Sequence, residues 1–410
     1  MRDGLVAALD IGSSKVCCLI ADVSRDGPPR VTGIGHQVSA GVRNGVITDL
    51  DAATHAITGA VHAAEEMAGE TIDRVVVALT GCQPRSRTIT ASVPLSGEQI
   101  GEGDIRRVLD LGRGRQMLEN EVVLHAIPRG YGIDGQFGIS DPRDMYGSEL
   151  SVEMHLVTAP ASHVRTLQTC VRRAHLMMDS PVATAYAAGL ASLVSDELEL
   201  GVTLVDMGAG RTSIGVFFDG ALVYTDSVPV GGSHVTNDIA HGLSTTISHA
   251  ERMKTLYGAA MPSPSDAQEV IDVPLVGEDG RRDGQQVPRA VLNTIIQPRM
   301  EETFELVRER LESSGVAHCA GRRVVLTGGA SQLQGVRDLA SHVLDKQVRI
   351  GRPIGFAGLA ETSGGPAFAT AAGLIAYAAR TQEEPAMQTV TKPRKAGLLG
   401  RLGLWMKESF

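Results

Sequence analysis

Two short stretches of the chain each combine an aspartate with a glycine-rich turn. The first reads DIGSSK and begins at Asp10, and the second reads DMGAGRT and begins at Asp206. A polyphosphate is held by backbone N–H groups that approach closely, which favours glycine and small hydroxyl residues in a tight turn. Its Mg²⁺ prefers carboxylate oxygens, usually through water. Together the two stretches predict a clamp for nucleotide phosphates, with a metal ion between the aspartates.

Either stretch alone has a simpler explanation, because a β-hairpin with a glycine-containing turn gives the same pattern. The two stretches resemble each other, however: AALDIGSSKVCCLI (7–20) and TLVDMGAGRTSIGV (203–216) share the order apolar, apolar, Asp, x, Gly, x, x, polar, x, apolar. Two copies of one strand-turn-strand unit predict two similarly built lobes that face each other. The chain has no GxxxxGK[ST] sequence and no GxGxxG after a strand, which argues against P-loop enzymes and Rossmann dehydrogenases.

A third stretch, LTGGASQLQG, places Gly328 and Gly329 after an apolar run. A purine could lie against this bare backbone. The alternative is a plain helix N-terminus, since Ser331 could cap a helix there.

Length and composition limit the class of protein. A chain of 410 residues, 43% hydrophobic and 21% charged, predicts two or more globular domains. The formal charge of −9 argues against a nucleic-acid binder, which needs clustered Lys and Arg. Five scattered cysteines without a CxxC pair indicate a reducing compartment, with no zinc site or disulfide framework. No signal peptide or spanning apolar stretch is evident, so synthesis in the cytoplasm is expected.

The elements around these motifs follow from periodicity. Strands are expected on both sides of the Gly12 turn, followed by a helix over 49–69 capped by Asp49 or Asp51 and a buried strand over 74–81. Residues 182–194 and 365–380 predict helices of small residues that permit close packing. A strand pair is expected across 278–284. A long helix over 290–315 contains Pro298, which should kink it or mark a boundary.

The motifs resemble those of a known family. The order of phosphate turn, small-residue helix, second phosphate turn, Gly-Gly segment and small-residue helix is that of the actin-like ATPase superfamily. Within it the chain is similar to the FtsA family of bacterial cell-division proteins, on matches that run nearly the full length in order. These matches are ALDIGSSKV, GVRNGVITDLDA, LHAIPRGYGIDG, MHLVTAPASHVRTLQTCVRRA, LGVTLVDMGAGRTSIGVF, HGLSTTISHAERMKTLYG, IIQPRMEE and VVLTGGASQLQGVRDLA.

The resemblance implies an α/β, actin-like (ribonuclease H-like) fold of two lobes and four subdomains, with an inserted FtsA-type subdomain and a C-terminal amphipathic helix. The expected first lobe comprises 1–83, 163–199 and the closing helix 354–380, interrupted by the inserted subdomain over 84–162. The expected second lobe comprises 200–235 and 312–353, with an outer subdomain over 236–311. A linker over 381–396 and a membrane-targeting helix over 397–410 complete the expected organisation.

The resemblance also assigns a nucleotide site, with ATP and Mg²⁺ as cofactors. The first turn contributes Asp10, Gly12, Ser13, Ser14 and Lys15. The second turn contributes Asp206, Gly208, Gly210, Arg211 and Thr212. Glu251 and Lys254 are implied to flank the adenosine, although an exposed i, i+3 helix pair is the alternative. Gly328, Gly329 and Ala330 are implied to lie along the nucleoside, and Asp10 and Asp206 to hold the metal, largely through water.

One departure concerns hydrolysis. Many ATPases of the superfamily carry an acidic or amide residue before the small-residue helix to orient the attacking water. Here that stretch is MMDSPVATAYAAG, and Asp179 comes early in its turn. We therefore expect at most slow ATP hydrolysis and assign no catalytic residue.

The partners implied by the resemblance are FtsZ, further copies of this chain in filaments, and later division proteins that dock on the inserted subdomain. The expected FtsZ contact lies near IIQPRMEE, where Arg299 could pair with an acidic tail.

The C-terminal segment predicts attachment to a membrane surface. On a helix from Gly397, Leu398, Leu402, Trp405 and Met406 share one face with Leu399 at its flank, while Arg401, Lys407 and Glu408 fall outside it. An apolar face, an indole and a preceding basic run favour an interfacial helix on anionic lipid. A helix docked on its own domain is the alternative, but it would not need the polar linker. The expected location is the cytoplasmic face of the inner membrane at the division site.

Two other functions fit parts of the sequence. A scaffold of the kind used in pilus assembly would share the nucleotide site but should lack the linker and tail. A soluble sugar kinase would need a catalytic aspartate and a sugar pocket, and the sequence offers no persuasive candidate for either.

Overall fold

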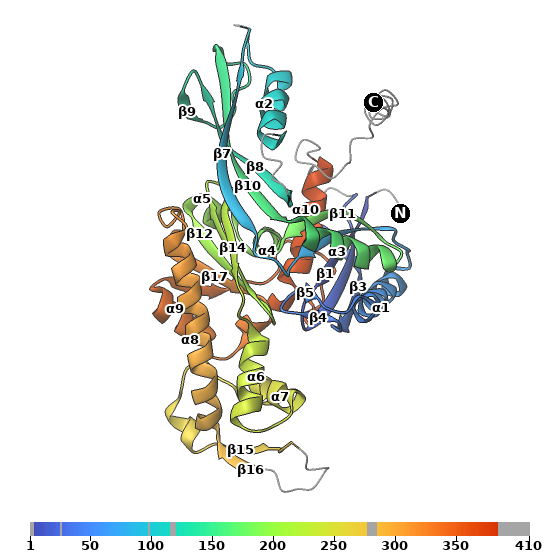
Figure 1. Ribbon diagram of the computed structural model, residues 1–410, viewed down its shortest axis with the longest axis vertical. Coiled ribbons are helices and arrows are strands. Elements are labelled where there is room, and N and C mark those ends of the chain that lie inside the picture. The colour runs from blue at the N-terminus through green and yellow to red at the C-terminus, as the bar shows by residue number, and fades with distance from the viewer. Residues whose placement is uncertain (1–3, 25–26, 97–98, 115–119, 277–284, 384–410) are drawn as a thin grey trace, which may run out of the picture.

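The computed structural model describes residues 4–24, 27–96, 99–114, 120–276 and 285–383. Its first lobe is a five-stranded sheet in the order β3-β2-β1-β6-β11 (Figure 1). The strands are β1 (Leu5–Ile11), β2 (Lys15–Asp22), β3 (Arg30–Val38), β6 (Arg74–Leu79) and β11 (Met177–Ala183). The first three pair antiparallel, and β6 and β11 continue the sheet in parallel.

The second lobe repeats this topology, in the order β14-β13-β12-β17-β18. Its strands are β12 (Val202–Met207), β13 (Thr212–Phe218), β14 (Ala221–Val228), β17 (Arg323–Thr327) and β18 (Gln347–Ile350). Again three strands pair antiparallel and two follow in parallel. The internal similarity of the sequence is therefore a true repeat of strand order and direction.

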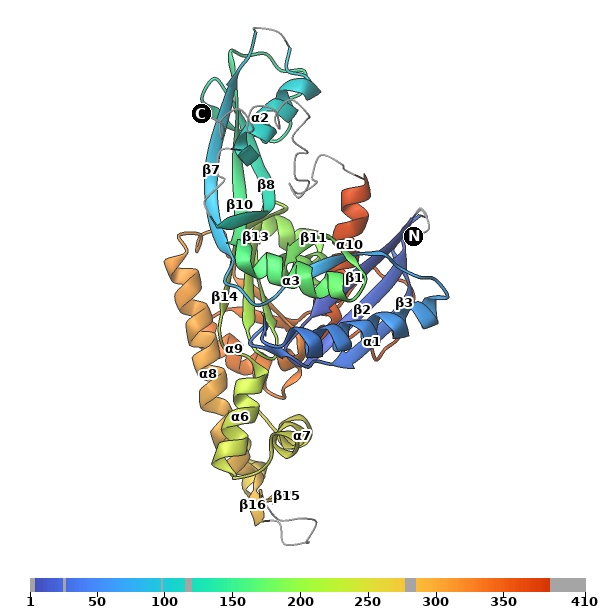
Figure 2. The same ribbon diagram turned by 45° about the vertical axis from the view of Figure 1, so that its right-hand side comes forward.

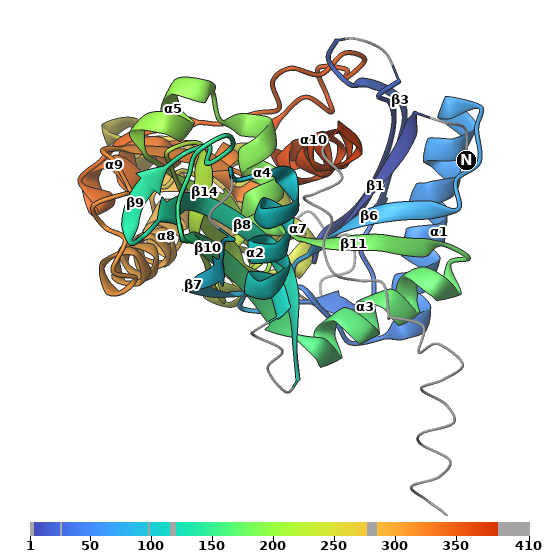
Figure 3. The same cartoon turned by 90° about the horizontal axis from the view of Figure 1, so that it is seen from above.

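Helix α1 (Leu50–Ala68) packs on the first sheet, as Figure 3 shows from above. The Asp49 carboxylate accepts from the backbone N–H groups of Asp51 and Ala52, so Asp49 is the cap that the helix uses. The helix ends at Gly69, which takes the left-handed conformation that glycine adopts without strain.

Two helices of small residues pack together at the centre of the molecule, α4 (Thr184–Ser192) and α10 (Ala369–Glu383). At Gly373 a Cβ atom would lie 1.7 Å from the carbonyl oxygen of Ala187, so this approach requires glycine. The abundance of alanine and glycine in both segments thus follows from close helix contact.

A separate four-stranded sheet projects from one end of the molecule (Figure 2). It contains β7 (Arg85–Pro94), β8 (Glu121–Ile133), β9 (Gln136–Ile139) and β10 (Glu149–Pro160) in the order β7-β10-β8-β9, with α2 (Glu102–Gly114) packed on it. The helix α3 (Ala161–Arg173) returns the chain to the first lobe. The four strands and α2 lie within residues 84–162, the range expected for the inserted subdomain.

The opposite end carries α6 (Gly232–Gly242), α7 (Ile247–Tyr257), the strand pair β15 (Val270–Val273) and β16 (Gln285–Pro288), and part of α8 (Arg289–Ser313) (Figure 1). The predicted strand pair is confirmed by the antiparallel pairing of β15 with β16, although residues 277–284 between them lie outside the described residues. Pro298 lies inside α8, which continues on both sides of it, so this proline does not separate two helices.

The alternative in which Ser331 caps a helix is wrong. Ser331 lies within a 3₁₀ turn (Gly329–Gln332), and its hydroxyl donates back to the Gly328 carbonyl at 2.7 Å. The following helix, α9 (Val336–Leu344), begins after Gly335. In the described ranges no helix combines the length and the apolar character needed to cross a bilayer.

Candidate functional site

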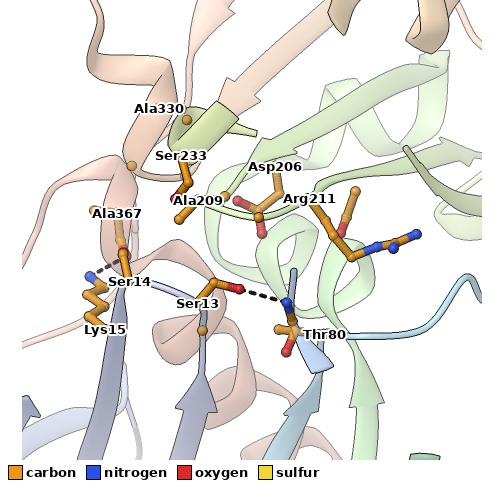
Figure 4. Close-up of a pocket in the computed structure, with 18 of the residues that line it drawn as sticks. Ser13, Ser14, Lys15, Thr80, Asp206, Ala209, Arg211, Ser233, Ala330 and Ala367 are labelled. Atoms are coloured by element: carbon orange, nitrogen blue, oxygen red, sulfur yellow. Dashed lines mark hydrogen bonds between the residues drawn. The ribbon is translucent and has the colours of Figure 1, made fainter. Parts of the chain in front are cut away.

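A cavity of about 950 Å³ lies between the two lobes and contains the predicted nucleotide residues, except Thr212 (Figure 4). Its volume is at the upper end of the roughly 300–1,000 Å³ that is typical of small-molecule sites. The predicted residues that line it are Asp10, Gly12, Ser13, Ser14, Lys15, Asp206, Gly208, Gly210, Arg211, Glu251, Lys254, Gly328, Gly329 and Ala330.

The two turns have the same backbone geometry. The N–H of Gly12 donates to the carbonyl of Lys15 at 3.0 Å, and the N–H of Gly208 donates to the carbonyl of Arg211 at 3.0 Å. Each turn connects the antiparallel strands of its lobe, β1 to β2 and β12 to β13. The repeat of sequence therefore produces a repeat of turn geometry at the cavity.

The turns are also in direct contact. A Cβ atom on Gly210 would lie 2.7 Å from the Ser13 hydroxyl and 2.6 Å from the Cα of Asn44. The same hydroxyl accepts a 2.6 Å hydrogen bond from the N–H of Gly45. Asn44 and Gly45 form the turn between β4 (Val42–Arg43) and β5 (Val46–Ile47). This turn therefore lies against both glycine turns at the cavity.

Lys15 is held at the edge of the cavity. Its ammonium group donates to the Ala367 carbonyl at 2.6 Å and lies 3.4 Å from the centre of the Phe368 ring. Burial lowers the pKa of Lys15, and the charges of Cys17, Asp10 and Asp206 oppose that shift. A phosphate in the cavity would offer this lysine a charged partner in place of a carbonyl.

Asp206 is buried and Asp10 is partly buried, and the two carboxylates belong to opposite lobes. Burial raises the pKa of each to about 6, and the charge of Asp10 adds to the shift of Asp206. Within the described residues neither carboxylate forms an ion pair, which favours a cation between them. The described residues contain no cluster of three or more His, Cys, Asp or Glu side chains able to hold a metal. The donor set therefore fits Mg²⁺ bound through water and phosphate oxygens.

Thr212 does not line the cavity. It is fully buried, and its hydroxyl donates to the Val230 carbonyl at 2.8 Å. This bond fixes the segment that leads from β14 to α6, so Thr212 supports the second turn from behind.

Lys254 and Glu251 form the predicted i, i+3 pair, but Lys254 is mostly buried. Its ammonium group donates to Glu251, to the hydroxyl of Thr236 at 2.9 Å and to the carbonyl of Gly232 at 3.1 Å. The lysine therefore ties α7 to the first turn of α6, while the more exposed Glu251 faces the cavity. This arrangement differs from a solvated pair on a helix surface.

Several cavity residues carry no motif that singles them out in the sequence. They include Gly45, Thr80, Thr184, Ala185, Ser213, Ser233, Thr236, Ala367 and Thr370. Gly231 and Gly232 did offer a signal, since a glycine pair after a strand marks a close backbone approach. A Cβ atom on Gly231 would lie 2.5 Å from the Gly208 carbonyl.

Three predicted features lie elsewhere. Asp179 makes an ion pair with Arg74 and does not line the cavity. Arg299 on α8 binds Asp238 on α6 at 2.6 and 3.1 Å and also pairs with Glu302. The expected membrane residues Leu398, Leu399, Leu402, Trp405 and Met406 lie outside the described residues.

Solved structures with low sequence identity share this fold. The chain aligns with a protein of the PilM–PilN type IV pilus biogenesis complex at a TM-score of 0.63 and 18% identity, covering 91% of this chain and 98% of that one. It aligns with MreB5 of Spiroplasma citri bound to ADP at a TM-score of 0.54 and 13% identity, covering 93% and 99%. The predicted actin-like fold is therefore confirmed.

Closer relatives match over the full length. The cell division protein FtsA of Agrobacterium fabrum is 44% identical over 423 residues, covering 100% of this chain and 96% of the relative. The FtsA proteins of Pseudomonas aeruginosa and Escherichia coli K12 are 34% and 32% identical, each covering 99% of this chain and 98% of the relative. The family model for cell division protein FtsA matches residues 203–373, and that for the SHS2 domain inserted in FtsA matches residues 81–158. The chain therefore belongs to the FtsA family of cell division proteins.

Proposed function

We propose that this protein binds ATP with Mg²⁺ between its lobes, assembles into filaments and tethers FtsZ filaments to the cytoplasmic face of the cell membrane at the division site. In this role it would also help to recruit later division proteins through the inserted subdomain. The observation that carries the proposal is the pair of matching turns, each with its own aspartate, in one cavity of an FtsA-family chain.

The nucleotide part rests on the chemistry of the cavity. The backbone N–H groups of the two glycine turns and the Ser13 and Ser14 hydroxyls suit phosphate oxygens, and Lys15 adds a positive charge. Mg²⁺ would neutralise part of the polyphosphate charge, with Asp10 and Asp206 orienting its water ligands. The solved structures of MreB5 with ADP and with AMPPNP show that this fold accommodates nucleotides in that protein.

Slow hydrolysis is part of the proposal. Where β11 leads into α4, the cavity is lined by Ala183, Thr184 and Ala185, none of which can act as a base. Asp179 is engaged by Arg74 at the other end of that strand. A nucleotide that persists for a long time suits a switch that controls assembly.

An equilibrium titration with a fluorescent ATP analogue, with and without Mg²⁺, tests nucleotide binding. Co-sedimentation with vesicles of anionic lipid, in the presence and absence of FtsZ, tests tethering. We expect FtsZ to sediment with vesicles only when this protein is present. Failure to bind the analogue, or FtsZ left in the supernatant, contradicts the corresponding part of the proposal.

The FtsZ contact is tested at Arg299. Because Arg299 is about 30% exposed and already paired with Asp238 and Glu302, an acidic tail would join an existing charge network. Arg299→Glu should weaken FtsZ binding and leave ATP binding unchanged. Arg308→Glu on the same helix is the control, since Arg308 is exposed and, within the described residues, its side chain donates only to the Val343 carbonyl. Unchanged FtsZ affinity in Arg299→Glu would place the contact elsewhere.

A further inference from the structure

Arg211 extends away from the phosphate turns. In Figure 4 its side chain runs in the direction opposite to Lys15 and Ser14. Its guanidinium donates to the Ser227 hydroxyl, at 2.8 Å from one nitrogen and 3.3 Å from another. The residue nevertheless lines the cavity. The cavity therefore continues past the second turn, toward strand β14 and the base of the inserted sheet.

The charge of Arg211 is not balanced. The guanidinium is half-buried, and within the described residues it forms no ion pair with a carboxylate. Burial lowers the pKa of Arg211, and the charges of Cys82 and Asp226 act against that shift. A half-buried cation whose hydrogen-bond partner is a neutral hydroxyl favours an anion beside it.

The nearest acid, Asp226, is already satisfied. Its carboxylate accepts from the Gln83 amide at 2.9 Å, the Tyr224 hydroxyl at 2.9 Å and the Ser227 N–H at 2.7 Å. Arg310 approaches it at 3.9 Å from outside the cavity. Asp226 is therefore engaged by these groups, and within the described residues it makes no ion pair with Arg211.

Other cavity residues complete a small polar recess. Ser213 pairs with Ser227 across β13 and β14, so its side chain lies on the same face of the sheet as the Ser227 hydroxyl that binds Arg211. Ser213 lines the cavity, and its hydroxyl has no partner within the described part of the chain. Cys82 and Pro84, from the segment that enters the inserted sheet, also line the cavity. Arginine and a free hydroxyl are donors suited to a tetrahedral oxyanion.

We propose that Arg211 and Ser213 form a second oxyanion subsite, which binds free inorganic phosphate beside a nucleoside diphosphate held by the two turns. The subsite is separate from the positions of the nucleotide's own phosphates, because the guanidinium points away from the turns. The role of a product site rests on the proposed nucleotide function, whereas anion binding by the recess does not. Phosphate bound at this subsite would act on the inserted sheet directly, through Cys82 and Pro84, which line the cavity and lead into that sheet.

Equilibrium dialysis with radiolabelled inorganic phosphate tests this proposal, with and without saturating ADP and Mg²⁺. We expect saturable phosphate binding that persists when ADP is bound. Arg211→Gln should weaken it at least tenfold, about 1.4 kcal/mol, and Arg211→Lys should retain part of the affinity. Ser213→Ala should weaken it a few-fold. Arg337→Gln removes an equal charge from an exposed residue on α9 and should change nothing.

Two results would overturn the subsite. One is phosphate affinity in Arg211→Gln and Ser213→Ala equal to that of the unmodified protein, with thermal unfolding unchanged. The other is loss of phosphate binding when ADP is added, which would place the anion in the nucleotide's own position. Absence of ADP binding contradicts the proposed nucleotide function instead, and the titration without nucleotide still decides whether the recess binds phosphate.

Discussion

The hydroxyl of Thr370 donates a 2.8 Å hydrogen bond to the Asp206 carboxylate. Thr370 belongs to α10 and Asp206 ends β12 of the second lobe, so the bond links the closing helix to the second phosphate turn. It lowers the pKa of Asp206, but burial and the charge of Asp10 outweigh it and raise that pKa to about 6. Without a bound cation, this carboxylate is ionised at neutral pH in a place that disfavours the charge.

Replacing the Asp206 carboxylate should stabilise the nucleotide-free protein and weaken its binding of ATP. Because the folded-state pKa lies above the usual 3.8, the folded protein binds the proton more tightly than the unfolded chain. Stability is therefore lost as pH rises through about 6, by at most ~3 kcal/mol at pH 7. Asp206→Asn removes that penalty and keeps an acceptor for Thr370. We expect a higher free energy of unfolding for the nucleotide-free protein and a loss of Mg²⁺-dependent ATP binding.

Urea unfolding at pH 7 and nucleotide titration measure the two effects. Asp219→Asn is the control, because Asp219 is exposed and its positive φ of 52° suits asparagine equally well. An Asp206→Asn protein with unchanged stability and normal Mg²⁺ dependence contradicts the role given to this carboxylate.

Gly210→Ala tests the contact between the two turns. The added Cβ atom would meet Ser13 and Asn44 at distances below 3 Å, so the turns must separate. We expect ATP affinity to fall at least tenfold, about 1.4 kcal/mol, in a protein that remains folded. Gly103→Ala on α2 is the control, since a Cβ atom there meets nothing within 4 Å. Equal affinity in both variants would show that the turns need not touch when nucleotide binds.

His125 gives the inserted sheet a pH-dependent attachment. Its Nε2 accepts from the backbone N–H of Ala183, at the cavity wall, at 2.9 Å. Burial, and to a smaller degree His155, lowers the pKa of His125 to about 3. The unfolded chain therefore binds more protons below pH 6.5, and stability present above that pH is lost as pH falls toward 3. The loss is at most ~1.4 kcal/mol per pH unit for this histidine.

His125→Gln should remove this contribution, because the glutamine oxygen accepts the same bond and does not titrate. Urea unfolding between pH 6.5 and 4.5 should then show a shallower loss of stability than in the unmodified protein. Asp10 and Asp206 contribute to stability with the opposite pH dependence, but they do so in both proteins. Comparing the variant with the unmodified protein at each pH therefore cancels their contribution. His62→Gln, on the exposed side of α1, should leave the slope unchanged. Parallel slopes for His125→Gln and the unmodified chain would contradict the assignment.

The sequence predicts the parts of the site that are local. A turn such as Gly12 to Lys15 contains its own hydrogen bond, so residue types within six positions are enough to predict it. Lys15 and Ala367 are 352 positions apart in the sequence, and Asp206 and Thr370 are 164 apart, so no local pattern reveals such partners. The direction of Arg211 is likewise set by Ser227 on the neighbouring strand. From its residue type and position, Arg211 was expected to bind a nucleotide phosphate. The structure instead directs its side chain away from the turn, toward Ser227.

The last prediction concerns Trp405, the single tryptophan of the chain. If Trp405 and the nearby leucines enter the headgroup boundary of a membrane, Trp405→Glu places a charge on the face that must be buried. This change, or truncation after Arg380, should release the protein from anionic vesicles and leave ATP binding intact. Raising the salt concentration should weaken attachment only in part, because screening acts on the basic residues and not on the apolar face.

Fluorescence of Trp405 distinguishes the two hypotheses for the C-terminal segment, a helix in the membrane surface and a helix docked on its own protein. Insertion into lipid should shift the emission of Trp405 to the blue when vesicles are added, and no other indole contributes to the signal. Lys395→Gln, just before the helix, is a useful comparison: it should reduce the vesicle affinity at low salt while the blue shift at saturation persists. Emission that is already blue-shifted in buffer and insensitive to lipid would mean that the segment packs against its own protein, and the anchor would then have to lie elsewhere.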